Sequence, residues 1–296
     1  MEIIHTIEWM KQAARLARVE GRLIGLVPTM GALHEGHLSL VRAARKSATG
    51  AGLVVVSIFV NPKQFGPQED FSEYPRAFEA DKEKLAALGV DVVFAPSAAE
   101  MYPDGFRTSI HVEDLSVRLE GRSRPGHFAG VTTVVLKLLE IVQPQFAFFG
   151  RKDAQQARIL RQMAADLNLD AEIVVCPIVR EPDGLALSSR DAYLKPEERR
   201  AATALFRALD AARREIEAGE TDALRLQTTL RRVLEAEPLA KTDYAGIADA
   251  ETFEPVTRLH RTALALLAVH IGSTRLIDNM LIEPGKDGDG DFRASL

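Results

Sequence analysis

The chain has 296 residues, of which 46% are hydrophobic and 27% are charged, a composition typical of globular domains. Its formal net charge of −5 argues against a surface built to neutralise nucleic acid phosphates. A single cysteine, Cys176, excludes an internal disulfide and any multi-cysteine metal site. The longest apolar run without a charge, 262–271, is about half as long as a bilayer span needs. We therefore expect a soluble cytoplasmic protein with no nucleic acid and no membrane among its partners.

The first 180 residues alternate segments rich in Val, Ile and Phe with segments of helical period. The predicted strands are 23–28, 53–60, 91–95, 146–149 and 172–179, and the predicted helices are 38–47, 77–88, 132–142 and 154–167. This alternation is typical of a parallel sheet crossed by helices, so we predict an α/β fold with a doubly wound, Rossmann-like parallel sheet. Ligands of such sheets bind outside the carboxyl ends of the strands.

The composition changes after the predicted sheet to a more charged, helical region. Pro196 near a first turn and Gly219 as a stop predict a long helix over 196–218. A helix over 222–235 follows, and then strands over 243–249 and 263–270. We expect a sheet domain over 1–180, a smaller α+β domain over 181–283 and a disordered Gly- and Asp-rich tail over 284–296.

Common nucleotide-binding motifs are missing. No Gly-x-Gly-x-x-Gly fingerprint follows a predicted strand, which argues against a nicotinamide or flavin dehydrogenase. Gly121 and Gly126 have Walker A spacing, but His127 stands at the lysine position. The sheet is therefore expected to bind its ligand in another way.

The segment VPTMGALHEGHLSLV, residues 27–41, runs from the first long strand through a Gly-containing turn into a helix predicted to begin near His37. Such a turn offers unpaired backbone N–H groups and the positive end of the helix dipole, which together favour an anion. His34 and His37 can donate to phosphoryl oxygens, and Gly36 between them lets a ligand approach the backbone. Two alternatives remain open: either histidine only caps the helix, or the pair binds zinc, for which two imidazoles alone are a weak signal.

The HEGH tetrapeptide resembles the HxGH signature of a nucleotidyltransferase superfamily, and the surrounding blocks resemble the pantoate–beta-alanine ligase family specifically. The matching blocks are SIFVNPKQFGPQEDFSEYPR (57–76), YPDGFRTSIHV (102–112), LEGRSRPGHFAGVTTVVLKLL (119–139), FFGRKDAQQ (148–156), VREPDGLALSSRDAYL (179–194) and STRLIDNM (273–280). They occur in this order along the chain up to about residue 283. The tetrapeptide alone names only a superfamily, whereas the ordered blocks are specific.

The resemblance implies a ligase that condenses (R)-pantoate with beta-alanine to pantothenate at the expense of ATP. The reaction proceeds through a pantoyl adenylate and releases AMP and pyrophosphate. The resemblance also implies a homodimer. We expect nucleotide and pantoate on the larger domain, and our hypothesis is that the smaller domain closes over the nucleotide as a lid. ATP chemistry implies Mg²⁺, whose protein ligands stay unassigned. Asp153 and Asp81 are the carboxylates to consider, although Asp81 is expected to be a surface charge on an exposed helix.

The resemblance also assigns site residues, each by the block that contains it. The implied ATP-binding residues are Met30, Gly31, Ala32, Leu33, His34, Glu35, Gly36, His37, Gly150, Arg151, Lys152, Asp153, Val179, Leu187, Ser188, Ser189 and Arg190. The implied catalytic residues are His37, His34, Lys152, Ser188, Ser189 and Arg190. The implied contacts to pantoate and beta-alanine are Gln64 and Gln156, and the expected apolar wall for the dimethyl group of pantoate is Pro28, Met30 and Phe65. Charge gathers on phosphoryl oxygens during adenylation, so donors and cations of these types suit the chemistry.

Three positions depart from the usual family pattern: Lys63, Arg151 and Asp191. None of them removes a group that the chemistry requires, so we expect an active enzyme. The alternatives are another HxGH nucleotidyltransferase, which would keep the nucleotidyl group in its product, and a non-catalytic nucleotide-binding module. The three functions differ in the substrates that they require and the products that they release, so product analysis with each substrate omitted in turn distinguishes them.

Overall fold

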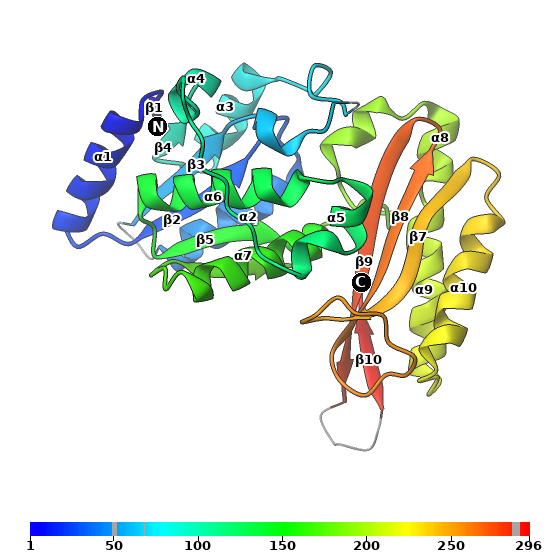
Figure 1. Ribbon diagram of the computed structural model, residues 1–296. Helices are drawn as coiled ribbons and strands as arrows, with labels where there is room; N and C mark the ends of the chain where they lie inside the picture. Colours follow the sequence, from blue (N-terminus) through cyan, green and yellow to red (C-terminus); the bar gives the residue numbers. More distant parts are fainter. Residues whose placement is uncertain (49–51, 68, 286–290) are drawn as a thin grey trace. The chain divides into compact units, whose positions relative to one another are not determined.

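A computed structural model describes residues 1–48, 52–67, 69–285 and 291–296 of the protein (Figure 1). The chain divides into two compact units. The N-terminal unit comprises Met1–Arg151 and Gln155–Pro177. The C-terminal unit comprises Ile178–Leu296 together with Lys152–Ala154, a short segment from the middle of the chain. Over the described ranges, none of the helices is long and apolar enough to cross a bilayer.

The N-terminal unit is built on a six-stranded parallel sheet with the order β1-β4-β3-β2-β5-β6. The strands are β1 (Glu2–Ile4), β2 (Ile24–Thr29), β3 (Leu53–Ile58), β4 (Val92–Phe94), β5 (Phe146–Gly150) and β6 (Glu172–Cys176). All five strands predicted for this region belong to the sheet, so the predicted α/β fold is confirmed. The chain extends the sheet from β2 through β3 to β4, and later adds β5 and β6 on the other side of β2. The loop after β2 therefore lies at the switch point of the sheet, where open α/β sheets bind ligands.

Helices of the N-terminal unit connect these strands. They are α1 (Ile7–Val19), α2 (Glu35–Ser47), α3 (Phe78–Ala87), α4 (Ala98–Met101), α5 (Leu119–Ser123), α6 (His127–Val142) and α7 (Ala154–Asp166), with 3-10 turns η1 (Pro62–Gln64) and η2 (Leu115–Val117). A further 3-10 turn, η3 (Arg151–Asp153), begins at Arg151 and runs into the segment Lys152–Ala154 of the C-terminal unit. Two helices begin earlier than predicted. Helix α2 begins at Glu35 because the His34 side chain caps it, and α6 begins at His127 after Gly126, whose φ of 84° ends the preceding turn.

Helix α6 packs on the turn η1 with backbone against backbone. A Cβ atom at Gly130 would lie 2.2 Å from the carbonyl oxygen of Lys63 and 2.6 Å from the Cα atom of Gln64. The Asn61 side chain bridges the two segments, since its Nδ2 donates to the Gly130 carbonyl at 3.1 Å. This close approach fixes the position of η1, and with it the Gln64 side chain that the turn carries.

The C-terminal unit is a four-stranded antiparallel sheet with the order β10-β9-β8-β7, packed against helices (Figure 1). Its elements are the 3-10 turn η4 (Ser189–Tyr193), helices α8 (Pro196–Ala201), α9 (Ala204–Glu217) and α10 (Ala223–Glu235), and strands β7 (Ala240–Asp249), β8 (Ala263–Ile271), β9 (Thr274–Pro284) and β10 (Phe292–Ser295). The single long helix predicted over 196–218 is interrupted. At Thr203 the hydroxyl donates to the Arg200 carbonyl at 2.8 Å, and the chain turns tightly before α9 begins.

The predicted disordered tail, 284–296, includes residues 286–290, which lie outside the described residues. Beyond them the structure differs from the expectation. Phe292–Ser295 form β10, which pairs antiparallel with β9, and Phe292 joins the apolar core of the unit. Burial of this one aromatic side chain explains why a Gly- and Asp-rich ending still contains a strand.

The packing at Gly130 yields a stability prediction. In Gly130→Ala, helix propensity alone would favour the variant, but the new methyl group meets backbone atoms that cannot rotate away. We expect a net loss of about 1–3 kcal/mol in the free energy of unfolding, measured by urea denaturation. The control is Gly246→Ala, where the nearest atom would be 3.7 Å from the new Cβ, and its stability should change little. Equal stability of the two variants would contradict the prediction.

Candidate active site

Asp81 holds the loop that follows β2. Its side chain is fully buried, and its two oxygens accept hydrogen bonds from the backbone amides of Ala32 and Leu33, both at 2.8 Å. Gly31 and Ala32 have φ values of 83° and 51°, the left-handed region that a non-glycine residue enters only at a cost. The expectation that Asp81 is an exposed surface charge is wrong. The Asp81 carboxylate on α3 can be buried because the amides of Ala32 and Leu33 donate hydrogen bonds to it in place of water.

The backbone amides of this loop are engaged by side chains. The Gly31 amide donates to Thr29 Oγ1 at 3.2 Å, and the Gly36 amide donates to His34 Nδ1 at 3.2 Å. Together with the two amides on Asp81, these bonds account for most of the loop. The expectation of unpaired N–H groups at this turn is therefore wrong. An anion at this position would be bound by side chains and by the dipole of α2 rather than by these amides.

His34 and His37 form a reciprocal cap on α2. Nδ1 of His34 accepts from the Gly36 amide, while Nδ1 of His37 accepts from the His34 amide at 3.4 Å. The ring centroids are 4.1 Å apart. A neutral imidazole whose Nδ1 accepts a bond carries its proton on Nε2. Each histidine can therefore cap the helix and contact a ligand at the same time. Nδ1 accepts the capping hydrogen bond, so the neutral ring carries its proton on Nε2, which is a donor.

Glu35, the first residue of α2, faces Arg42 two turns further along the helix. Arg42 Nη1 and Nη2 donate to the Glu35 carboxylate at 2.5 and 3.2 Å. The hydrogen bond from Arg42 lowers the pKa of Glu35. The negative charge next to the two imidazoles is thereby paired with a cation.

Gln64 is held by a small hydrogen-bond network on the same unit. Its Nε2 lies 2.9 Å from the Met30 sulfur, and its Oε1 accepts from Asn61 Nδ2 at 3.2 Å. Asn61 is buried, and its Oδ1 accepts from the Tyr102 hydroxyl at 2.8 Å. The structure thus brings the predicted residues Met30 and Gln64 together. It adds Asn61, which lies within the matched block 57–76 but was not singled out.

His127 anchors the same turn from α6. Its Nδ1 lies 2.8 Å from the Gln64 carbonyl, and its Nε2 lies 3.1 Å from Arg124 Nη1. Burial lowers the pKa of His127 to about 4, and the neighbouring Arg124 charge acts in the same direction. His127 is therefore neutral at pH 7, with Nδ1–H donating to Gln64. Sequence reasoning noted His127 only as a mismatch to Walker A.

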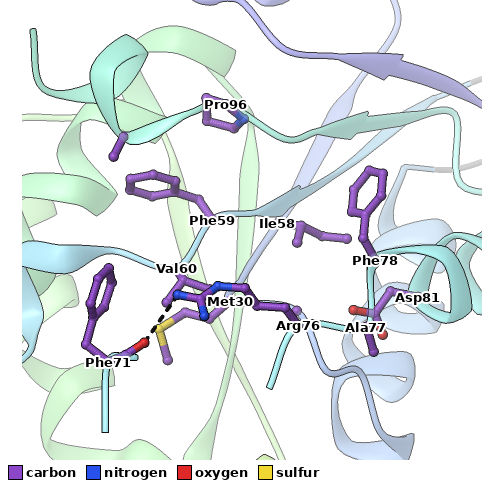
Figure 2. Close-up of a pocket in the computed structure, with 12 residues that line it drawn as sticks. Met30, Ile58, Phe59, Val60, Phe71, Arg76, Ala77, Phe78, Asp81 and Pro96 are labelled. Atoms are coloured by element: carbon purple, nitrogen blue, oxygen red, sulfur yellow. Dashed lines mark hydrogen bonds between the residues drawn. The ribbon is translucent and has the colours of Figure 1, made fainter. Parts of the chain in front are cut away.

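A pocket of about 330 Å³ adjoins the loop after β2 (Figure 2). Phe59, Phe71 and Phe78 form much of its wall, and Met30 and Asp81 border it. It lies at the carboxyl ends of β2, β3 and β4, the general position of ligand sites in such sheets. The pocket is mainly apolar, with the Asp81 carboxylate already committed to backbone amides.

Of the residues predicted to form an apolar wall for pantoate, Met30 and Phe65 lie in different surroundings. Met30 lines the pocket, whereas the Phe65 ring packs against Phe71 and Tyr74 with centroid distances of 5.4 and 5.9 Å. The departure Lys63 is exposed, with its Nζ 5.2 Å from the centroid of the Tyr102 ring. A cation–π contact therefore accommodates the added charge.

The two neighbouring glutamines of α7 differ in their surroundings. Gln155 is buried, and its Nε2 donates to the Leu115 and Arg118 carbonyls at 2.8 and 2.9 Å. Gln156 is half-buried. Gln155 thus has a packing role, and Gln156 is the one of the pair that keeps an accessible side chain.

The C-terminal unit carries Lys152, Asp153, Val179 and Leu187–Arg190 of the predicted ATP-binding residues, whereas Gly150 and Arg151 belong to the N-terminal unit. Ser188 caps η4, since its Oγ accepts from the Arg190 amide at 3.2 Å. The Leu187 amide donates to the Val179 carbonyl at 3.0 Å, which closes a hairpin just before the Ser188–Arg190 segment. Lys152 belongs to this unit as well. The structure thus groups Lys152, Val179 and 187–190 on one body.

Asp191, one of the three departures from the expected family pattern, binds the backbone of the segment that it follows. Its Oδ2 accepts from the Ser188 amide at 2.7 Å, and its Oδ1 is buried with no hydrogen-bond partner among the described residues. Burial raises the pKa of Asp191, while the Ser188 amide and the positive charge of Lys152 act in the opposite direction. The departure therefore affects the cap of η4 and places a carboxylate close enough to Lys152 to interact with its charge.

The carboxylates near these segments differ in their fitness to bind a metal. Both oxygens of Asp81 accept backbone amides, whereas Asp153 is exposed next to Lys152. Within the described ranges, no group of three or more His, Cys, Asp or Glu side chains could hold a metal ion. A magnesium ion carried in by nucleotide phosphates needs only one or two protein carboxylates, and Asp153 fits that requirement.

Comparison with known proteins decides the family. The family model for pantoate-beta-alanine ligase matches residues 2–281. The chain belongs to the pantoate–beta-alanine ligase family. Pantothenate synthetase from Roseiflexus castenholzii is 56% identical over 283 residues, which cover 96% of this chain and all of that protein. The corresponding protein from Koribacter versatilis is 52% identical over 290 residues, 98% of this chain and 99% of that protein. This ligase is therefore an enzyme of the class that the resemblance implied.

Solved structures agree. Pantothenate synthetase from Thermus thermophilus superimposes with a TM-score of 0.88 at 44% identity, covering 94% of this chain and 98% of that one. Pantoate-beta-alanine ligase from Francisella tularensis, described as complexed with beta-gamma ATP and beta-alanine, has a TM-score of 0.77 at 37% identity, covering 94% and 97%. The predicted fold of both parts of the ligase is confirmed.

The buried Asp81 yields a prediction that separates positioning from stability. In Asp81→Asn, one loop amide would face an NH₂ group, which costs about 1–3 kcal/mol of stability and loosens the loop. We expect the KM for ATP to rise by about tenfold or more. Steady-state kinetics and urea denaturation measure the two effects.

The matched control for this prediction is Asp91→Asn. Asp91 also accepts a backbone amide, from Val54 at 2.8 Å, but it lies at the amino ends of the strands. This variant should lose stability and keep its KM for ATP. A normal KM for ATP in Asp81→Asn would contradict the positioning effect.

His127 yields a prediction for pH. The unfolded imidazole takes up a proton near pH 6.5, whereas the folded one stays neutral down to about 4. Stability therefore falls as the pH drops through this range, by up to about 3 kcal/mol from this group. His127→Gln keeps a donor for the Gln64 carbonyl and removes the titration. The variant should lose less stability than the parent between about pH 7.5 and about pH 4.5 in urea denaturation. Parallel losses would show that His127 does not carry the effect.

Proposed function

We propose that this ligase condenses (R)-pantoate with beta-alanine through a pantoyl adenylate, releasing AMP and pyrophosphate. The observation that carries the proposal is the histidine pair at the switch point of the sheet. The two ring centroids lie 4.1 Å apart at the start of α2, directly after the loop whose amides donate to the buried Asp81 carboxylate. A preorganised pair of donors suits a reaction in which negative charge develops on phosphoryl oxygens.

We assign ATP to three segments: Met30–His37, Gly150–Asp153 and Leu187–Arg190, with Val179 beside the adenine. His34 and His37 donate from Nε2 to phosphate oxygens, because Nδ1 of each ring is used in the cap of α2. Lys152 and Arg190 offset the triphosphate charge as a point cation and a planar fork. Ser188 and Ser189 supply hydroxyl donors.

We assign pantoate to Gln64 and Gln156, with beta-alanine also near Gln64. A neutral amide can donate to and accept from hydroxyl groups without competing for the reacting carboxylate. Gln64 is held by Asn61 and by the His127 contact to its carbonyl, so its amide is preoriented. The carboxylate of pantoate attacks the α-phosphate and displaces pyrophosphate. The amine of beta-alanine then attacks the acyl carbon, loses a proton and displaces AMP.

Mg²⁺ accompanies the nucleotide in this proposal, with Asp153 as the protein carboxylate that would hold it. The bound ion would neutralise charge on the phosphates and on departing pyrophosphate. The protein groups act beside it: His37 stabilises the oxygens of the α-phosphate, and Lys152 orients the remaining phosphates.

We further propose a cytoplasmic homodimer whose C-terminal unit closes as a lid during adenylation. The family resemblance supports the dimer, and the free, buried Cys176 suits a reducing compartment. Closure would exclude water from the acyl adenylate, which otherwise hydrolyses.

Product analysis tests the function. With ATP, pantoate and beta-alanine together, we expect pantothenate, AMP and pyrophosphate in equal amounts. Without beta-alanine, pantoate-dependent exchange between pyrophosphate and ATP should persist, because the adenylate still forms reversibly. Retention of the nucleotidyl group in the product would instead indicate another nucleotidyltransferase, and absence of exchange would indicate a binding module.

The His37 side chain is the sharpest single test of the assigned chemistry. His37→Ala removes a donor to the α-phosphate and should lower the rate of pantoate-dependent exchange by about 10²–10³-fold. The exposed His260 provides the control, and His260→Ala should retain the parental rate. Near-parental exchange in His37→Ala would remove this residue from the mechanism.

A further inference from the structure

Two neighbouring residues in the middle of β9, Asp278 and Asn279, are polar and almost fully buried. Their exposed fractions are 3% and 1%. On β8 they face Leu267 and Leu266, and the neighbouring pairs Ala268–Ile277 and Ala265–Met280 are apolar. Burying two adjacent polar side chains in a sheet is costly unless each has partners, so their contacts indicate their purpose.

Asn279 holds the backbone of Lys152. Its Nδ2 donates to the Lys152 carbonyl oxygen at 3.0 Å. Lys152 is far from β9 in sequence and comes two residues after the end of β5, yet Lys152–Ala154 belong to the C-terminal unit. The Asn279 amide is thus a direct link between β9 and the residue that we assign to the triphosphate.

Asp278 holds the hairpin that leads to Ser188. Its two oxygens accept from Arg180 Nη1 at 2.7 Å and Nη2 at 3.0 Å. The same Nη1 donates to the Gly184 carbonyl at 3.0 Å, and Arg180 pairs with Ala186 across the hairpin. Asp278 therefore fixes the base of the segment that ends in the Ser188 cap.

The two β9 residues are also linked to each other. Oδ1 of Asp278 accepts from the backbone amide of Asn279 at 2.8 Å, which helps to orient the Asp278 carboxylate. Burial raises the pKa of Asp278, while Arg180 and the positive charge of Lys152 act in the opposite direction. The positive charge of Lys152 thus acts to lower the pKa of both Asp278 and Asp191.

We propose that Asp278 and Asn279 are positioning residues that hold Lys152 and the Ser188–Arg190 segment in register with each other for ATP binding. The inference rests on the proposed function, since it takes these two segments as nucleotide contacts. Through these two adjacent residues, β9 connects Lys152 with the Ser188–Arg190 segment, which lies more than thirty residues further along the chain. Neither residue needs to touch the nucleotide to have this effect.

Asn279→Leu tests the proposal. The variant keeps a side chain of similar size and removes the donor to Lys152. The KM for ATP should rise by about tenfold or more, while the KM for pantoate should change by less than about twofold because Gln64 and Gln156 belong to the other unit. Asn279→Ser, which retains a hydroxyl donor, should recover part of the ATP affinity.

The control is Asp243→Asn. Asp243 pairs with Arg275 at 2.8 Å on the same sheet, and this variant should keep both KM values. A KM for ATP within about twofold of the parent in Asn279→Leu, or equal increases in both KM values, would overturn the proposal. If Asn279→Leu does not fold, Asn279→Ser decides: its KM for ATP should rise by at least about threefold and its KM for pantoate should not, and any other result overturns the proposal.

The parental enzyme separates the two hypotheses. If it shows no pantoate-dependent exchange between pyrophosphate and ATP, the proposed function fails. If it shows exchange and the Asn279 variants bind ATP normally, only the positioning role fails.

Discussion

The bond between the buried Asp81 carboxylate and the amides of Ala32 and Leu33 determines the loop on which the site depends. Breaking these hydrogen bonds is costly, because it would leave a buried carboxylate and two backbone amides unpaired away from water. The bond also holds Ala32 at a positive φ, which costs roughly 1–2 kcal/mol for a residue with a side chain. The conformation that presents His34 and His37 is therefore imposed by a residue 48 positions further along the chain.

A similar arrangement recurs in the C-terminal unit. Asp191 accepts the Ser188 amide, and Asp278 accepts the Asn279 amide and the Arg180 guanidinium. In each case a carboxylate binds the protein itself, close to cationic or donor side chains assigned to phosphate. Carboxylates facing an anionic ligand would oppose its binding, whereas carboxylates committed to backbone amides make the surrounding donors rigid. Both units thus use acidic residues to orient basic and polar ones.

The sequence predicted the sheet because its strands are continuous apolar runs, as in Leu53–Ile58, which are buried on both faces. The candidate site residues come from the ordered family blocks that contain them, and their roles stay a prediction. Helix α1 was missed because two of its buried residues are alanines while Trp9 and Leu16 are exposed. Asp81 and Asn279 could not be found from local pattern. A carboxylate among helical charges, or an amide in a strand, shows its role only through partners distant in sequence.

The excursion of Lys152–Ala154 into the C-terminal unit means that the backbone passes between the two units three times rather than once. A fragment ending at Pro177 would retain Lys152 but lose the Asn279 side chain that binds its carbonyl. The two units are therefore interlaced in sequence, and cleavage near Pro177 alone would leave Lys152–Ala154 on the N-terminal fragment. Evolution by simple addition or exchange of the smaller unit would have to preserve this three-residue crossing.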